Sequence, residues 1–158
     1  MAARAFLKID GIKGESTDAK HAGEIDVEAF SWGLSHSGSG GVGGGGEAGK
    51  VSLSDFSFVT RSTTASPQLV LACASGKHLK EAVFTARRAG AAAVEFLKIT
   101  FTDVLISSYQ ESGGDDVPGD SVSFNFAKIK FEFTPTGAKG TPGARVSAGW
   151  DQKANKKF

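Results

Sequence analysis

The feature that most constrains this 158-residue chain is an alternation of apolar and polar residues with a period of two, interrupted by glycines. This period is typical of β-strands that bury one face, since successive side chains of a strand point to opposite sides. The pattern is clearest in residues 96–109, where it places Phe101 and Leu105 on the same face. Shorter stretches follow it at 5–9 and 82–88. The sequence therefore predicts a mainly β fold.

Three regions shift the phase of this alternation, which happens when one extra residue exchanges the two faces of a strand. In residues 121–133 the shift falls between Phe126 and Ile129 and predicts a bulge near Ala127 and Lys128. The other two shifts lie at 27–30 and 53–56. Bulged and strongly bent strands are what a closed or corner-turning sheet requires. We therefore expect a small bent-strand β-barrel or two-sheet barrel.

One segment has the signals of a short α-helix that packs on the side of this barrel. Ser66 favours the N-cap, Pro67 suits the first helical position, and Gly76 can end the helix in the left-handed conformation. Between these signals, Leu69 and Ala72 share one face. The predicted helix is short, so tertiary packing must stabilise it.

The charge balance argues against two classes of partner. Lys plus Arg number 18 and Asp plus Glu number 17, and so small a net charge gives no long-range field for nucleic acid or an anionic membrane. No stretch reaches the length of a membrane span, so we expect neither nucleic-acid binding nor membrane insertion. The N-terminus lacks the apolar run of a secretory signal. We expect folding in the cytoplasm and, for any extracellular role, export without a signal peptide.

A glycine-rich segment at residues 37–50 separates two predicted strands, and we expect it to be mobile in the isolated subunit. Its end nearly matches a phosphate-binding loop, but Val51 replaces the magnesium-binding hydroxyl and a strand follows where a helix is needed. The segment exceeds the length that a hairpin requires, so we hypothesise that it contacts a neighbouring subunit. The candidate interface residues are Ser37, Gly40, Gly43, Gly46, Gly49 and Lys50.

The remaining polar residues form no recognisable catalytic or metal-binding pattern. Cys73 is the only cysteine, which excludes an internal disulfide and a cysteine-rich zinc site. The three histidines are widely separated, and His21 is predicted to help a turn beside Asp18. Asp115 and Asp116 lie in a Gly/Pro-rich segment and are interpreted as solvated loop charges. We therefore expect no enzyme activity, no cofactor and no metal.

Short phrases in a fixed order, from about residue 5 to residue 133, resemble the haemolysin-coregulated protein (Hcp) family of type VI secretion tube proteins. They include FLKIDGIKGESTD at 6–18, FSWG at 30–33, ASPQL at 65–69, ASGKH at 74–78 and DVLISSY at 103–109. The residues that carry the family pattern and to which we assign structural roles are Glu15, Ser16, Asp18, His21, Trp32, Ser66 and Pro67.

The resemblance implies a β-barrel subunit that forms hexameric rings, which stack into the inner tube of the secretion machine. It also implies that the tube carries effector proteins in its lumen, is expelled with them, and contacts sheath, spike and baseplate proteins. Residues 1–134 would form the Hcp-like domain. Residues 135–158 would be a C-terminal extension without an assigned role, whose last strand is predicted at 145–150.

Other functions remain open from the sequence. The chain could be a tube subunit of a related phage-tail-like contractile particle. It could instead be a β-barrel module that binds a carbohydrate or peptide by stacking on Trp32, Tyr109 or Trp150, although aromatic residues in strands usually belong to a core. The sequence does not decide whether polar positions such as Lys98 and Thr100 line a channel or an outer wall.

Overall fold

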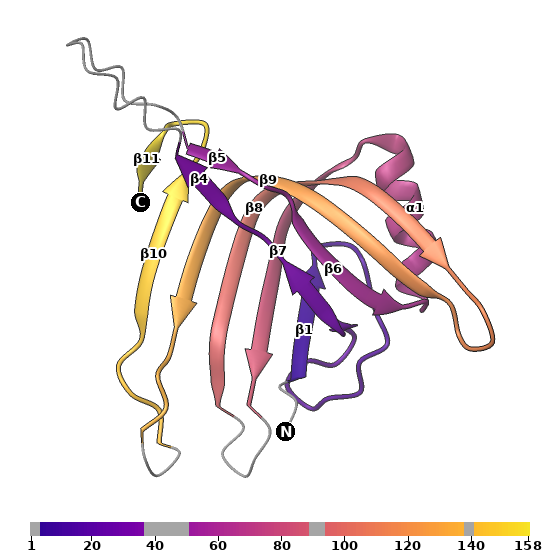
Figure 1. The fold of residues 1–158 in the computed structure, drawn as a ribbon, viewed down its shortest axis with the longest axis horizontal. Helices are drawn as coiled ribbons and strands as arrows, with labels where there is room; N and C mark the ends of the chain where they lie inside the picture. Colours follow the sequence, from indigo (N-terminus) through magenta and orange to yellow (C-terminus); the bar gives the residue numbers. More distant parts are fainter. Residues whose placement is uncertain (1–3, 37–50, 89–93, 138–140) are drawn as a thin grey trace.

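The computed structural model describes residues 4–36, 51–88, 94–137 and 141–158 (Figure 1). Strands dominate these residues, together with one α-helix, which confirms the mainly β prediction. The strands are β1 (Arg4–Ile9), β2 (Ile25–Val27), β3 (Ala29–Ser31), β4 (Leu34–His36), β5 (Val51–Leu53), β6 (Phe56–Arg61), β7 (His78–Arg87), β8 (Glu95–Ser112), β9 (Gly119–Phe133), β10 (Val146–Asp151) and β11 (Lys156–Lys157); the helix is α1 (Ala65–Ser75).

One antiparallel sheet organises the fold, in the order β11-β10-β9-β8-β7-β1-β2. The long strand β9 is shared between two branches of this sheet. Residues 119–124 pair with β6, whereas residues 128–133 pair with β10. Strands β3 and β6 therefore lie over β7 and β1, and the apolar core fills the space between the two layers (Figure 1).

The prediction of a closed barrel is wrong. Among the described residues, the strand pairing leaves the sheet open. Strand β2 pairs with β1, while β3 pairs with β6 in the other layer. The chain crosses between the layers at Glu28, whose backbone N–H donates a hydrogen bond to the Val59 carbonyl at 2.8 Å. Because β2 and β3 have only three residues each, they cannot pair along the full length of the long strands. The sheet curls over itself without closing.

The expected phase shift of β9 is present, since Phe126 and Ile129 are both buried. The predicted bulge beside it is wrong, because β8 and β9 keep one register there and the register shift lies between Ile106 and Ser108. The register places Ala127 opposite Asp103, where the backbone has a positive φ of 57°. Both strands thus exchange faces at the same level without an inserted residue.

This exchange also corrects the prediction of one uninterrupted face for residues 96–109. Phe101 is buried on the first half of β8, but beyond Asp103 the buried residues are Val104 and Ile106, and Leu105 is only partly buried. A left-handed residue turns the strand, so the alternation on either side of it cannot stay in phase.

Helix α1 packs against β8 and contributes the buried side chains of Leu69 and Ala72 to the core. It ends as expected at Gly76, which has a φ of 64°. The N-cap prediction is wrong, because the helix begins at Ala65 and Ser66 lies inside its first turn. No helix among the described residues combines the length and the apolarity needed to cross a bilayer.

Candidate functional site

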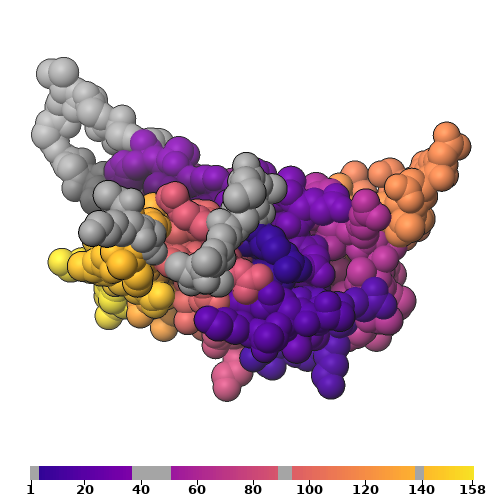
Figure 2. Space-filling view, turned by 90° about the horizontal axis from the view of Figure 1, so that it is seen from below, coloured from indigo at the N-terminus to yellow at the C-terminus, as the bar shows by residue number. Residues whose placement is uncertain are grey.

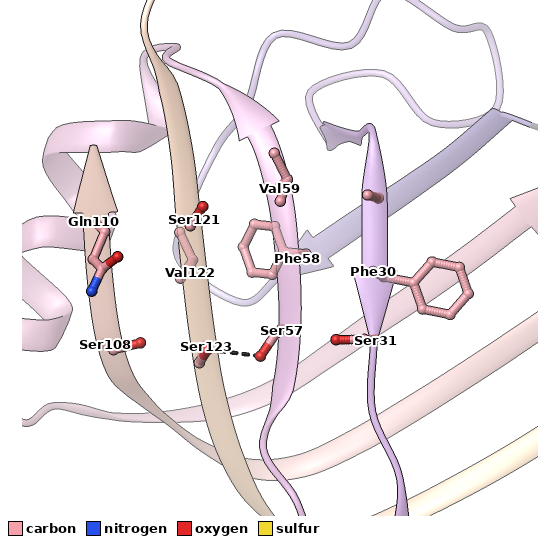
Figure 3. Close-up of a pocket in the computed structure, with 11 residues that line it drawn as sticks. Phe30, Ser31, Ser57, Phe58, Val59, Ser108, Gln110, Ser121, Val122 and Ser123 are labelled. Atoms are coloured by element: carbon pink, nitrogen blue, oxygen red, sulfur yellow. Dashed lines mark hydrogen bonds between the residues drawn. The ribbon is translucent and has the colours of Figure 1, made fainter. Parts of the chain in front are cut away.

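The sheet registers bring four serines into one transverse row (Figure 3). Ser31 of β3 pairs with Ser57 of β6, Ser57 pairs with Ser123 of β9, and Ser123 pairs with Ser108 of β8. The hydroxyl oxygens of Ser57 and Ser123 are 2.8 Å apart and share a hydrogen bond. Paired residues of neighbouring strands project from the same face, so the four hydroxyls form a continuous polar line. We call this line the serine row.

A second row runs parallel to the serine row and contains Ala29, Val59, Ser121 and Gln110. The two rows line a shallow open groove with a volume of about 510 Å³, and none of its lining residues is charged. Beneath the groove, Phe58 and Val122 point into the core and are fully buried. This face therefore offers hydroxyls, one amide and small side chains to solvent, a chemistry suited to wet and weak contacts.

The four strands that carry the two rows have an unpaired edge on each side. In the described part of the chain, β3 pairs only with β6. On the other side, the pairing of β8 with β7 stops at Leu105, so among the described strands residues 106–112 pair only with β9. Unpaired edges expose backbone N–H and C=O groups and serve as templates for another strand.

Several of the family-pattern residues gather on the outward face of β1, under the loop of residues 10–24. His21 is buried and stacks on Phe6, with 4.4 Å between ring centroids. Its Nδ1 lies 2.8 Å from a carboxylate oxygen of Glu24, and its Nε2 lies 2.7 Å from one of Glu95. His21 thus belongs to a turn, as predicted, and also ties this loop to the start of β8, a contact that sequence spacing did not reveal.

Asp18 fastens the same loop to β7. Its carboxylate accepts hydrogen bonds from the guanidinium of Arg87, which holds the pKa of Asp18 well below its usual range. Beside it, Ser16 is buried and accepts a hydrogen bond from the Asp18 N–H at 3.3 Å. Glu15 is exposed and, among the described contacts, makes no side-chain hydrogen bond. Asp18 and Ser16 thus position the loop.

Ser66 and the completely buried Asp120 make a second polar connection, between α1 and the start of β9. The carboxylate of Asp120 accepts hydrogen bonds from the hydroxyls of Ser66 and Ser62. Burial raises the pKa of Tyr109 to about 12, and a hydrogen bond to Asp120 adds to this effect. Pro67 is exposed and is the third residue of the helix, so the prediction that it takes the first helical position is wrong. Sequence reasoning missed Asp120, because its Pro-Gly-Asp setting resembles an ordinary turn.

The glycine-rich interface candidates Ser37, Gly40, Gly43, Gly46, Gly49 and Lys50 lie outside the described residues. Strand β5 begins at Val51, which agrees with the strand expected after the near-match to a phosphate loop. Across the residues that can be described, no three His, Cys, Asp or Glu side chains are arranged to hold a metal ion. Asp115 and Asp116 are exposed, as expected of solvated loop charges.

The aromatic residues considered as ligand-stacking groups pack against the core. Trp32, Tyr109 and Trp150 are each partly buried there. The rings of Trp32 and Phe131 are 5.9 Å apart, which is a normal separation for an aromatic pair. This packing supports the core interpretation for Tyr109, whereas Trp32 and Trp150 pack on the core and also line an open pocket.

Comparison with known proteins assigns the chain to a family. The family model described as "Type VI secretion system effector, Hcp" matches residues 6–133. The chain belongs to the Hcp family. Protein hcp1 of Pseudomonas aeruginosa is 46% identical over 159 residues, which cover 98% of each chain. The resemblance noted from the sequence is thereby confirmed.

Solved structures of type VI secretion proteins share the fold over nearly the whole chain. The Hcp1 structure from Salmonella typhimurium has a TM-score of 0.82 at 37% identity, with 100% of each chain covered. A structure described as a type six secretion system protein reaches a TM-score of 0.91 at 29% identity, covering 99% of this chain and 100% of the other. A type VI secretion effector from Yersinia pestis has a TM-score of 0.76 at 34% identity, covering 93% and 98%. The chain is thus a component of type VI secretion.

Proposed function

We propose that this Hcp-family chain is a structural, non-catalytic subunit of the secretion tube. Copies associate side by side into hexameric rings, and the rings stack into the inner tube within the sheath, below the spike and on the baseplate. Effector proteins travel in the lumen and are expelled with the tube, so the protein assembles in the cytoplasm and ends outside the cell. The observation that carries this proposal is the pair of unpaired edges on the four-stranded segment bearing the serine row.

The directions of the strands suit lateral assembly. Strands β3, β6, β9 and β8 are antiparallel to their neighbours in turn, so β3 and β8 run in opposite directions. When residues 106–112 of one copy lie beside β3 of the next, the antiparallel alternation continues across the boundary. The two edges are different surfaces, so the contact is heterologous, and a constant rotation from copy to copy closes it into a ring.

The two outward faces of the subunit favour the serine row as the lumen wall. The groove on the serine-row face has an uncharged lining, and beyond it on β6 Arg61 forms an ion pair with Glu28. The outward face of the other layer is charged: the register places Lys130 beside Thr100, Lys128 beside Thr102, and Glu132 beside Lys98. A hydroxyl wall without fixed charge binds no single class of cargo strongly, since charged surfaces attract or repel partners over longer distances. Lys98 and Thr100 would then belong to the outer wall.

A labelling experiment tests this assignment. In a Cys73→Ser background, Ser121→Cys places a thiol in the second row, and Lys80→Cys places a matched thiol on an exposed position of β7. We expect a small maleimide to modify both variants in assembled tubes. A maleimide on a polymer wider than the lumen should modify only Lys80→Cys. Equal labelling of both thiols by the polymer reagent would show that the serine row does not face an enclosed channel.

A further inference from the structure

Helix α1 has an unusual surface for a helix at the outside of a protein. Its eleven residues include no charged side chain. Leu69 and Ala72 fill the core side, yet Val70 and Leu71 point outward with 45% and 68% of their surface exposed. A helix that is apolar on all sides normally lies buried, whereas a surface helix carries charges on its outer face. The outer face of α1 therefore has the composition of an interface.

A second apolar surface lies between the β4–β5 ribbon and the strands β9 and β10. We define the apolar mouth as the opening lined by Trp32, Leu34, Leu53, Phe131 and Trp150. It has a volume of about 540 Å³, within the range of about 300–1,000 Å³ typical of ligand pockets. Among the described residues, the Nε1 donor of Trp150 is buried without a hydrogen-bond partner. An occupant that supplies apolar atoms and an acceptor would satisfy both features.

These two surfaces lie at opposite ends of the longest axis of the molecule. Strands β4, β5 and β10, which help to line the mouth, lie at one end, while α1 and the β8–β9 hairpin form the other end (Figures 1 and 2). The ends also differ in charge. The tip of the β8–β9 hairpin is acidic, with Glu111, Asp115 and Asp116, and Lys77 and Arg61 lie closer to α1 and β6. The segment after β10 is basic, with Lys153, Lys156 and Lys157. The hairpin tip and this segment are thus opposite in charge, and each end of the molecule has an exposed apolar surface.

We infer that the apolar mouth of one copy receives the Val70–Leu71 face of α1 from the next copy. This inference rests on the proposed ring and names the contact that supports it alongside the paired strand edges. The arrangement is heterologous, because mouth and helix are different surfaces of each subunit. The end of α1 also offers acceptors for Trp150. The N–H groups of Gly76 and Lys77 bond to the carbonyls of Cys73 and Ala72, and no described bond uses the last carbonyls, Ala74 and Ser75.

Two single substitutions separate the two halves of this contact. Leu71→Asp puts a charge on the helix face, and Leu34→Asp puts one at the mouth. Leu34 is 58% exposed, so we expect the Leu34→Asp chain to stay folded. Burial of a leucine corresponds to a factor of about ten to a hundred in affinity, so each variant alone should be largely monomeric. Leu71→Met and Lys80→Asp are the controls and should form rings like the original chain.

The decisive step mixes the two variants in equal amounts. Each pair of copies then has one intact contact, from the helix of Leu34→Asp into the mouth of Leu71→Asp, so light scattering should show a one-to-one dimer and no ring. Rings that persist in either single variant, or a mixture that stays monomeric, would overturn the inference. Absence of rings in the unaltered chain would instead contradict the proposed function, so the two failures are distinguishable. Circular dichroism confirms that each variant is folded.

Discussion

Two regions of the core, the cluster of rings around Phe56 and the apolar mouth, differ in how completely one chain fills them. Around Phe56 the core is closed: its ring lies within 6.4 Å of the rings of Phe58, Phe84, Phe101 and Phe124, and all five side chains are buried. At the apolar mouth, Trp32, Phe131 and Trp150 are only partly buried and surround an open volume.

This difference separates stability from assembly. Close packing around Phe56 gains dispersion and hydrophobic energy within the single chain. The same kinds of side chain at the mouth gain it fully only when something covers them. A substitution in the Phe56 cluster should therefore act on folding, and a substitution at the apolar mouth should act on association.

The largest effect on the free energy of unfolding is expected from Phe56→Ala in the buried Phe56 cluster. Removing a fully buried phenylalanine leaves a cavity among four aromatic rings and should lower the free energy of unfolding by about 3–5 kcal/mol. Urea denaturation followed by circular dichroism measures this change. A fall in the free energy of unfolding of less than about 1 kcal/mol would mean that the Phe56 cluster is not packed as described.

Trp32→Ala at the mouth should have a smaller effect on the monomer and a larger one on association. The side chain is only partly buried, so we expect the free energy of unfolding to fall by about 1–2 kcal/mol. The ring population should fall more than it does for Lys80→Ala at the same protein concentration. Equal ring populations in these two variants would contradict the assignment of association to the apolar mouth.

Tyr109→Phe probes the polar connection beside α1 and should lower the free energy of unfolding by about 0.5–1.5 kcal/mol at neutral pH. The folded pKa of Tyr109 is about 12, above its ordinary value of about 10. The neutral phenol thus stabilises the fold fully below pH 10, and this contribution is lost as the pH rises from about 10 through 12. The advantage of the original chain over the variant should shrink across that window. A constant difference up to pH 12 would argue against a buried phenol.

The smallest effect is expected from Asp115→Ala combined with Asp116→Ala. Both carboxylates are exposed in the β8–β9 hairpin, and exposed charges contribute at most about 1 kcal/mol. The melting temperature should stay the same, and rings should still form. Because these charges face the lysines of the next copy in our account, ring affinity should become less dependent on salt. A large fall in melting temperature would reveal a buried role.

Much of the fold was predictable from local signals. Gly76 ends α1 as expected because glycine adopts the left-handed conformation without steric cost. The shifted N-terminus of α1 shows the limit: the hydroxyl of Ser66 donates to Asp120, a residue 54 positions away, so a good capping residue was used elsewhere. The open sheet was missed for a related reason, since bent strands indicate curvature but not whether two edges meet.

The candidate site depended on information that no single segment contains. The serine row joins residues from four strands, and only the registers show that Ser31 and Ser108 lie on one line. Serine is common at exposed strand positions, so each member looks unremarkable alone. The mouth likewise combines β4 and β10, which are far apart in the sequence. One signal was available and overlooked: residues 65–75 carry no charge, which is unusual for a surface helix and is the basis of the interface proposed for α1.

The central claim is that each subunit has two different ends that meet in a closed ring. Size-exclusion chromatography with light scattering, followed by negative-stain imaging of the same fractions, tests it most directly. We predict a discrete species of six 16.3-kDa chains, seen as closed rings with a central channel. A monomer at every accessible concentration, or a symmetric dimer that grows no further, would contradict the account.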